Sequence, residues 1–291
     1  MRLGGLLKNS SVTFFIILGC LAVSAQSLTT DHNPYYGNQF YHAVEQQGAK
    51  DEALIRLIFS VISTKHSVRM ASAMGEQGAC LGRCVGSQSL SYQQARKELL
   101  GNISLKQDGN TYYVQDVYCA KKFYANDFRG AKKLGPGMIP DENLLNTEHT
   151  WPQSRFNRSI DRDTQKTDLH HLYPSDSQLN AIRGNFKFGN VPGAGEDLKC
   201  PISKRGRNSR NEIIFEPPKE HKGNAARAIF YFSIRYDLRV EEDEEKALRE
   251  WIDEDPVDAE EMRRNNMINE IQGNRNPFID HPELVHRINN F

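Results

Sequence analysis

Cysteine is scarce in this 291-residue sequence, which has five in all, and beyond the first 25 residues no stretch is apolar and long enough to span a membrane. Only Cys80 and Cys84 lie close together in the sequence. Because no second closely spaced pair accompanies them, the evidence for a zinc site is weak. No His-Glu-x-x-His string is present, which makes a zinc peptidase improbable. Zinc-finger, homeodomain and RNA-recognition patterns are also missing, so nothing indicates sequence-specific base reading.

The first 25 residues have the composition of an export signal. Arg2 and Lys8 supply positive charge, residues 12–23 are apolar, and small residues precede a cleavage point after Ala25. We therefore predict a signal peptide over residues 1–25 and no stable membrane insertion, because the apolar run is shorter than the roughly 20 residues that span a bilayer. Lipidation at Cys20 is the alternative.

Removal of the signal leaves an even number of cysteines: Cys80, Cys84, Cys119 and Cys200. In an exported chain this number predicts disulfides, and four cysteines allow three pairings, between which the sequence does not choose.

The formal net charge of zero conceals an uneven distribution. Residues 241–261 hold twelve Asp or Glu and two Lys or Arg, a net charge of -10. Residues 26–291 as a whole sum to -2, so the remainder carries +8. A polyanion could bind this basic remainder, notably a loop at residues 199–210, while the acidic segment faces away. Two ordinary solvated surfaces explain the charge equally well.

Apolar periodicity and turn residues predict a single α+β domain over residues 26–291, richer in helix than in strand. No internal repeat or low-complexity linker divides it. The expected helices cover residues 54–62, 92–100, 241–252 and 256–271. Another helix is expected to begin at Gly223-Asn224, and a short one to follow Pro282. A hairpin with its turn at residues 108–110 leads into a strand at 111–118, and a short strand covers 211–215.

Two stretches, residues 146–154 and 168–174, followed by a run to residue 185, concentrate the reactive side chains. In under fifty residues they contain a carboxylate, three imidazoles, a carboxamide and a guanidinium. Glu148 and Asn180 offer the oxygen ligands that a hard divalent cation prefers. Such a set suits metal-assisted attack on a phosphodiester, where the cation offsets the developing negative charge.

His149 follows Glu148 directly, and neighbours on an extended segment point to opposite sides. The carboxylate can then hold a cation while the imidazole removes a proton from water near neutral pH. Asn180 belongs on a helix that begins near Pro174-Ser175, with Arg183 on the same face. His170 and His171 are more often structural, although an Asp-x-His-His zinc site remains an alternative.

The order of these motifs resembles the bacterial endonuclease I family of periplasmic or secreted non-specific nucleases, which carry a ββα-metal finger. The matching segments are residues 146–149, 151–154, 168–172, 180–185, 215–218, 222–228 and 274–280. The resemblance covers roughly half of the chain, and residues 26–125 have no clear counterpart in it.

The resemblance implies that Glu148 and Asn180 bind one divalent ion, usually Mg²⁺, with Mn²⁺ or Ca²⁺ able to occupy the site, and that His149 is the general base. One arginine contacts the phosphate, and Arg155, Arg158 and Arg162 are the choices, of which we select Arg158. Arg183 is a second phosphate candidate with an equally good case as a packing residue. Structural roles are expected for Asn185 and Asn276, whereas Glu216 either supports the site residues from behind or is simply a charge at the end of a strand, and we favour the latter.

The sequence thus predicts a monomeric, periplasmic or secreted, metal-dependent endonuclease that cleaves DNA without sequence preference, with RNA as a further possible substrate. One alternative is an exported nucleic-acid-binding protein on a degenerate nuclease fold. The other is a zinc hydrolase that uses His149, His170 and His171.

Overall fold

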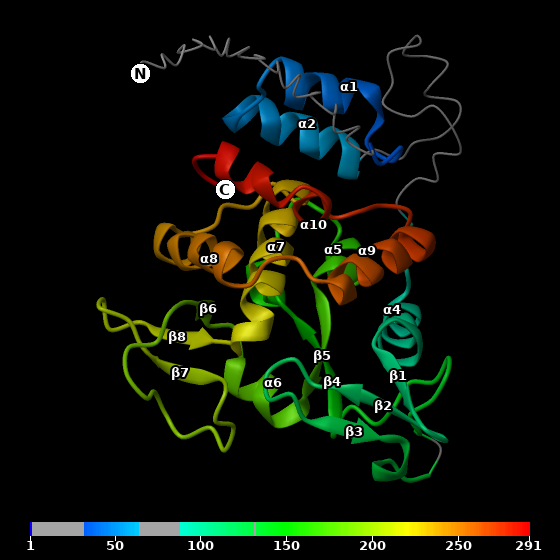
Figure 1. Ribbon diagram of the computed structural model, residues 1–291. Helices are drawn as coiled ribbons and strands as arrows, with labels where there is room; N and C mark the ends of the chain where they lie inside the picture. The colour runs from blue at the N-terminus through cyan, green and yellow to red at the C-terminus, as the bar shows by residue number, and fades with distance from the viewer. Residues whose placement is uncertain (2–31, 64–87, 131) are drawn as a thin grey trace. The chain divides into compact units, whose positions relative to one another are not determined.

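The computed structural model describes Met1 and residues 32–63, 88–130 and 132–291 (Figure 1). Residues 2–25 of the predicted signal peptide lie outside the described residues, as do Cys80 and Cys84. Residues 32–291 form one compact unit. Among the described residues, no helix combines the length and apolar character needed to cross a membrane.

Helices make up most of the regular structure. The α-helices are α1 (Gly37–Tyr41), α2 (Asp51–Ser63), α4 (Tyr92–Glu98), α5 (Arg162–Lys166), α6 (Ser177–Arg183), α7 (Lys219–Arg235), α8 (Glu242–Glu254), α9 (Ala259–Gln272) and α10 (Pro277–Asp280). Shorter helical turns cover His42–Gln46, Leu99–Ile103, Ala125–Asp127, Gln153–Arg155, Leu169–His171 and Pro282–Arg287. The predicted helices at 54–62, 92–100, 241–252 and 256–271 are confirmed, with end points that differ by a few residues.

Helix α7 begins at Lys219, four residues before the predicted start at Gly223. Glycine there does not open the helix; it permits a close approach, because a Cβ at residue 223 would collide with the carbonyl oxygen of Asp255. Pro218 precedes the first turn, where its fixed φ is tolerated.

Three small sheets complete the α+β fold that the sequence predicts. The first has the order β1-β2-β3, from β1 (Leu105–Asp108), β2 (Thr111–Gln115) and β3 (Lys122–Tyr124), and it confirms the predicted hairpin. The second pairs β4 (Leu145–His149) with β5 (Leu172–Asp176), antiparallel. The third has the order β6-β8-β7, from β6 (Lys187–Phe188), β7 (Lys204–Arg207) and β8 (Ile213–Glu216).

The segment 199–210 was expected to be a loop, and this prediction is wrong in its central part. Residues 204–207 form β7, which pairs antiparallel with β8 through registers such as Arg205↔Phe215. A run of basic residues broken by proline and glycine gives no strand signal by itself, so the pairing with β8 determines the conformation.

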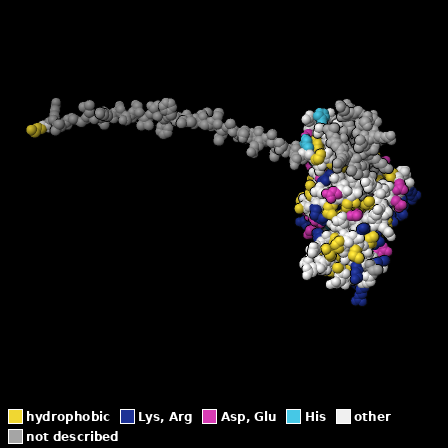
Figure 2. Space-filling view, turned by 90° about the vertical axis from the view of Figure 1, so that its right-hand side faces the viewer, with side chains coloured by type: hydrophobic (Ala, Val, Ile, Leu, Met, Phe, Trp, Pro, Cys, Tyr) yellow, Lys and Arg dark blue, Asp and Glu magenta, His cyan; other side chains and the backbone are white. Residues whose placement is uncertain are grey.

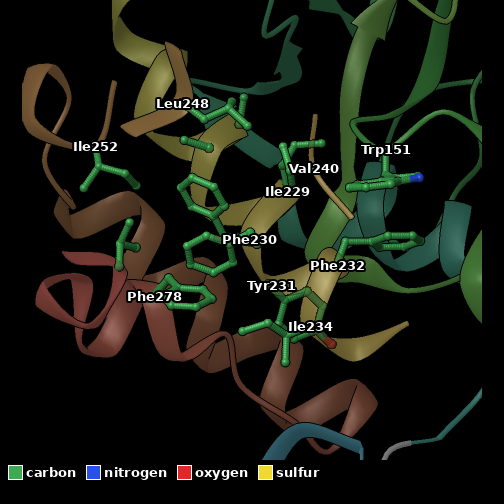
Figure 3. Packing of buried hydrophobic residues seen from close by; sticks show 14 of the residues in the cluster. Trp151, Ile229, Phe230, Tyr231, Phe232, Ile234, Val240, Leu248, Ile252 and Phe278 are labelled. Atoms are coloured by element: carbon green, nitrogen blue, oxygen red, sulfur yellow. The ribbon is translucent and has the colours of Figure 1, made fainter. Parts of the chain in front are cut away.

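Helix α7 runs through the main hydrophobic core. Figure 3 shows its side chains Phe230 and Phe232 among the buried residues, with Trp151, which follows β4, beside Phe232. The rings of Trp151 and Phe232 are stacked with centroids 5.6 Å apart. The central helix therefore holds the chain just beyond the end of β4, where the predicted reactive residues lie.

The acidic helix α8 packs against α7 rather than standing apart from it. Glu244 is almost fully buried and pairs with Arg155 at 2.7 Å, and Glu245 pairs with Arg249 at 2.5 Å. On the face shown in Figure 2, basic and acidic side chains are interspersed. Ion pairs within the fold therefore compensate part of the negative charge of residues 241–261.

One disulfide lies within the described residues and joins Cys119 to Cys200, across 81 positions of sequence. It connects the turn between β2 and β3 to the segment that leads into β7.

Candidate active site

The pairing of β4 with β5 brings the two predicted reactive stretches together. Glu148 lies opposite Tyr173 and His149 opposite Leu172. Helix α6 follows β5 directly, so strand, strand and helix succeed one another around the site. The expected helix start at Pro174-Ser175 is wrong, because both residues belong to β5 and Asp176 caps the helix by accepting hydrogen bonds from the backbone of Gln178 and Leu179.

A cavity of about 300 Å³ lies between these elements. Four of the five predicted site residues line it: Glu148, His149, Asn180 and Arg183. Arg158 does not line it.

Glu148 is 1% exposed and uses one carboxylate oxygen for its protein contacts. Its Oε1 accepts a hydrogen bond from the Tyr118 hydroxyl at 2.8 Å and forms an ion pair with Arg183 Nη1 at 3.1 Å. Burial raises the pKa of Glu148, and the Arg183 charge and the Tyr118 hydrogen bond oppose that shift. Within the described part of the chain no hydrogen bond engages Oε2, so this oxygen remains for a ligand.

Tyr118 is a site residue that sequence reasoning missed. It is fully buried, and burial raises its pKa well above the usual value, so the hydroxyl stays protonated and can donate. It stands 30 residues before Glu148, in the turn between β2 and β3, and no local pattern distinguishes it from a core tyrosine. Its position next to Cys119 is the one available signal.

The imidazole of His149 is held in one tautomer. Its Nε2 lies 3.0 Å from the carbonyl oxygen of Lys166, which can only accept, so Nε2 carries the hydrogen. Nδ1 is then the basic nitrogen, 3.4 Å from Nε2 of Gln153 at the cavity wall. Burial lowers the pKa of His149 to about 4, so the ring is neutral near neutral pH.

The Asn180 carboxamide is oriented by its amide nitrogen, which donates to the carbonyl oxygen of Thr147 at 3.3 Å. No donor among the described residues engages its Oδ1. Asn180 Oδ1 and Glu148 Oε2 are therefore two cavity oxygens to which no described residue donates a hydrogen bond. One carboxylate and one neutral oxygen fit a hard divalent cation that takes its other ligands from water and phosphate.

The zinc alternative lacks its ligands. No group of three or more His, Cys, Asp or Glu that could hold a metal occurs among residues 32–63, 88–130 and 132–291. His170 and His171 are buried, and the Nε2 atoms lie 3.1 Å and 2.9 Å from the carbonyl oxygens of Asn274 and Gln165. Both histidines therefore tie segments of the core together.

Arg183 is 1% exposed, and its guanidinium group makes its contacts within the protein interior. Besides Glu148, its guanidinium donates to the carbonyl oxygens of His149 at 3.2 Å and Thr150 at 2.5 Å. These contacts fix the end of β4 on helix α6. The geometry favours positioning of Glu148 and His149 over contact with a phosphate.

The other three arginines lie in different surroundings. Arg155 is bound to Glu244, whereas Arg162 is exposed and donates to Oε1 of Gln153 at 2.9 Å. Arg158 is exposed and lines a second hollow that adjoins the cavity.

Glu216, Asn276 and Asn185 all make contacts within the fold. Glu216 accepts from the Lys222 ammonium and the Val191 amide, both at 2.9 Å. Asn276 caps α10, and Asn185 donates to the Ser154 hydroxyl at 3.3 Å on the cavity wall.

The basic segment 199–210 is less available for phosphate than its composition suggests. Arg205 pairs with Glu196 at 2.5 Å, Arg210 pairs with Asp243, and Arg207 donates to the Asn211 carbonyl oxygen. Two of its five basic residues, Arg205 and Arg210, are therefore already paired with acidic side chains within the fold.

Comparison with known proteins places this site in context. The family model described as Endonuclease I matches residues 79–283. An extracellular ribonuclease of Bacillus subtilis (strain 168) is 37% identical over 183 residues, covering 57% of this chain and 59% of that protein. An extracellular deoxyribonuclease of Aeromonas hydrophila is 32% identical over 205 residues, covering 60% of this chain and 86% of that protein. The chain thus matches about three fifths of the length of the Bacillus ribonuclease.

Proposed function

Since this chain belongs to the endonuclease I family, we propose that it is an exported, metal-dependent endonuclease that hydrolyses phosphodiester bonds of DNA or RNA. The observation that carries the proposal is the shared cavity of Glu148, Asn180 and His149, where two oxygens that receive no hydrogen bond from the described residues accompany a neutral imidazole. The names of the relatives, which include both a ribonuclease and a deoxyribonuclease, support a nucleic acid as substrate.

Glu148 and Asn180 would hold one divalent ion, for which Mg²⁺ is our choice and Mn²⁺ or Ca²⁺ are substitutes. When bound, such an ion neutralises the negative charge that develops on the phosphate and on the leaving 3′-oxygen. Tyr118 and Arg183 keep the Glu148 carboxylate in place by occupying its other oxygen.

His149 is the proposed general base. Its Nδ1 takes a proton from water as the water oxygen bonds to phosphorus, and the bond to the 3′-oxygen breaks. The Lys166 carbonyl oxygen keeps the proton of the ring on Nε2, so that Nδ1 is always the accepting nitrogen. The pKa of about 4 leaves the free ring unprotonated, and the negative charge of a bound phosphodiester raises the pKa and strengthens the base.

A periplasmic or extracellular location is part of the proposal. The signal-like residues 1–25 support it, as do relatives named extracellular ribonuclease and periplasmic deoxyribonuclease.

The test is nicking of supercoiled plasmid by purified residues 26–291 with Mg²⁺ or with EDTA. We expect cleavage that requires the metal ion and falls at least about 10²-fold in His149→Ala, the usual loss for a general base. His42→Ala is the matched control, because His42 is exposed on the first helical segment and lines no part of the cavity.

A folded, oxidised protein that binds nucleic acid but cuts none under either condition would favour the binding-protein alternative. Cleavage that survives both EDTA and His149→Ala would place the active site elsewhere.

A further inference from the structure

A second hollow adjoins the cavity of His149. It has a volume of about 570 Å³ and is formed by the loop of residues 153–162. The two spaces share Gln153 and Ser154 as wall residues, so they are neighbouring compartments of one surface. A volume of this size lies in the range of small-ligand sites and exceeds what one phosphate needs.

The loop around this hollow is held by a buried glutamine. Gln165 is 0% exposed, and its side chain donates to the carbonyl oxygens of Asn157 at 2.9 Å and Ile160 at 3.1 Å while accepting from the Asn157 amide at 2.8 Å. The Asn157 side chain donates in turn to the Tyr236 carbonyl oxygen at 2.8 Å. The hollow is therefore preformed, which reduces the entropy cost of binding a ligand.

The lining combines apolar and cationic groups. Phe156 and Ile160 are half-buried, pack against the main core, and also line the hollow. Arg158 and Arg162 are exposed on the same loop. The carboxylate of Asp161 is occupied, since it caps α5 by accepting from the Thr164 amide at 2.7 Å and hydroxyl at 2.9 Å.

We propose that this hollow is a nucleotide subsite that receives an unpaired base next to the scissile phosphate, with Arg158 on the flanking backbone phosphate. The inference rests on the proposed function of the adjoining cavity. The apolar side chains that line the hollow can contact any base, and a guanidinium donates to the phosphate oxygens, so the two together can bind single strands without reading sequence. A base within a duplex is paired and stacked, and it must leave the helix to enter such a pocket.

The consequence is a preference for single-stranded or locally opened nucleic acid. Binding can be measured in EDTA by fluorescence anisotropy, with three labelled probes of equal length: oligothymidylate, an abasic oligomer with the same backbone, and a duplex hairpin. We expect oligothymidylate to bind on the order of tenfold more tightly than either of the others.

Two variants test the two halves of the subsite. Ser159→Leu fills the hollow from an exposed position and should bring the affinity for oligothymidylate down to that for the abasic oligomer. Arg158→Ala should weaken binding of all three probes by roughly tenfold and raise KM more than it lowers kcat, and Arg158→Lys should restore much of the loss. Arg56→Ala, at an exposed arginine on α2, is the control of equal charge.

Equal affinity of the unaltered protein for the three probes, or unchanged binding in folded Ser159→Leu, would overturn the subsite. Plasmid cleavage in Mg²⁺ is scored separately. If the protein cleaves plasmid but binds the three probes equally, the proposed nuclease activity stands and the subsite is refuted. If binding depends on the bases but no cleavage occurs, the subsite stands and the proposed activity is refuted.

Discussion

Arg183 and Glu148 form an ion pair of 3.1 Å in which the two side chains are 1% and 2% exposed. The pair joins helix α6 to strand β4 at the floor of the cavity. A buried pair can cost as much in desolvation as it gains in attraction, but the loss of one partner leaves the other charge buried alone.

Arg183→Met should therefore destabilise the protein strongly. We expect the free energy of unfolding to fall by about 3 kcal/mol or more, because Glu148 loses its counter-charge and two backbone carbonyls lose their donor. Urea unfolding measures the change. Arg205→Met is the matched control, with a partly exposed pair to Glu196 and an expected loss below about 1 kcal/mol. Equal losses in both variants would contradict the structural role of Arg183.

Tyr118→Phe removes one hydroxyl and leaves the ring. We expect the Mg²⁺ concentration for half-maximal cleavage to rise about tenfold or more, because groups that orient a metal ligand commonly contribute this much. The circular dichroism spectrum should stay unchanged. Tyr113→Phe on β2 is the control, since its ring lies beside Tyr124 and does not line the cavity. Unaltered metal dependence in Tyr118→Phe would show that Arg183 alone holds Glu148.

Stability should decline as the solution is acidified. Burial lowers the pKa of His149 and of His170 to about 4, whereas an unfolded histidine titrates near 6.5. Between these values the unfolded chain binds more protons, so the stabilisation is complete above about pH 7 and is lost as the pH falls toward about 4. At about pH 5 each histidine should cost roughly 2 kcal/mol.

Urea unfolding near pH 7 and near pH 5 measures this loss. In His149→Gln the difference between the two conditions should shrink by about 2 kcal/mol, the share assigned to that residue. An unchanged difference would mean that His149 binds protons equally in the folded and unfolded states over this pH range, which contradicts the lowered pKa.

Reduction of the Cys119–Cys200 disulfide should lower both stability and activity. A cross-link over 81 residues contributes about 4 kcal/mol by the chain-entropy argument. It also fastens the segment around Tyr118, whose carbonyl oxygen accepts from the Ser203 hydroxyl at 2.6 Å and whose own hydroxyl holds Glu148. A Cys119→Ser and Cys200→Ser double variant should therefore cleave plasmid more slowly than a Cys80→Ser and Cys84→Ser variant. Full activity in reductant would disprove the dependence.

The part of the site that is local in sequence could be predicted from sequence. Glu148 and His149 are adjacent in the sequence and therefore lie together in any fold, and both line the cavity. Asn180 and Arg183 follow from helical spacing, even though the helix starts at Ser177 and not at Pro174.

The contacts that define each role could not be predicted, because their partners are distant in sequence. Tyr118 reaches Glu148 across 30 residues, and Gln165 supports a loop that precedes it. The basic character of residues 199–210 suggested a phosphate contact, but the acidic partners Glu196 and Asp243 lie outside that segment and were invisible to a local count of charge. The start of α7 was predicted too late in the chain, because Gly223 allows a close approach of Asp255 and does not initiate the helix.

The chain between β4 and β5 is anchored separately at its two ends. Arg183 binds the carbonyl oxygens of His149 and Thr150 where the chain leaves β4, and the Lys166 carbonyl oxygen holds the His149 ring near the return. Arg155 and Phe156 are tied to the core between these anchors, whereas Arg158 and Ser159 are exposed and can be exchanged while the reacting groups stay fixed. Exchanges at these two positions would change which polymer is selected and leave the chemistry of cleavage intact.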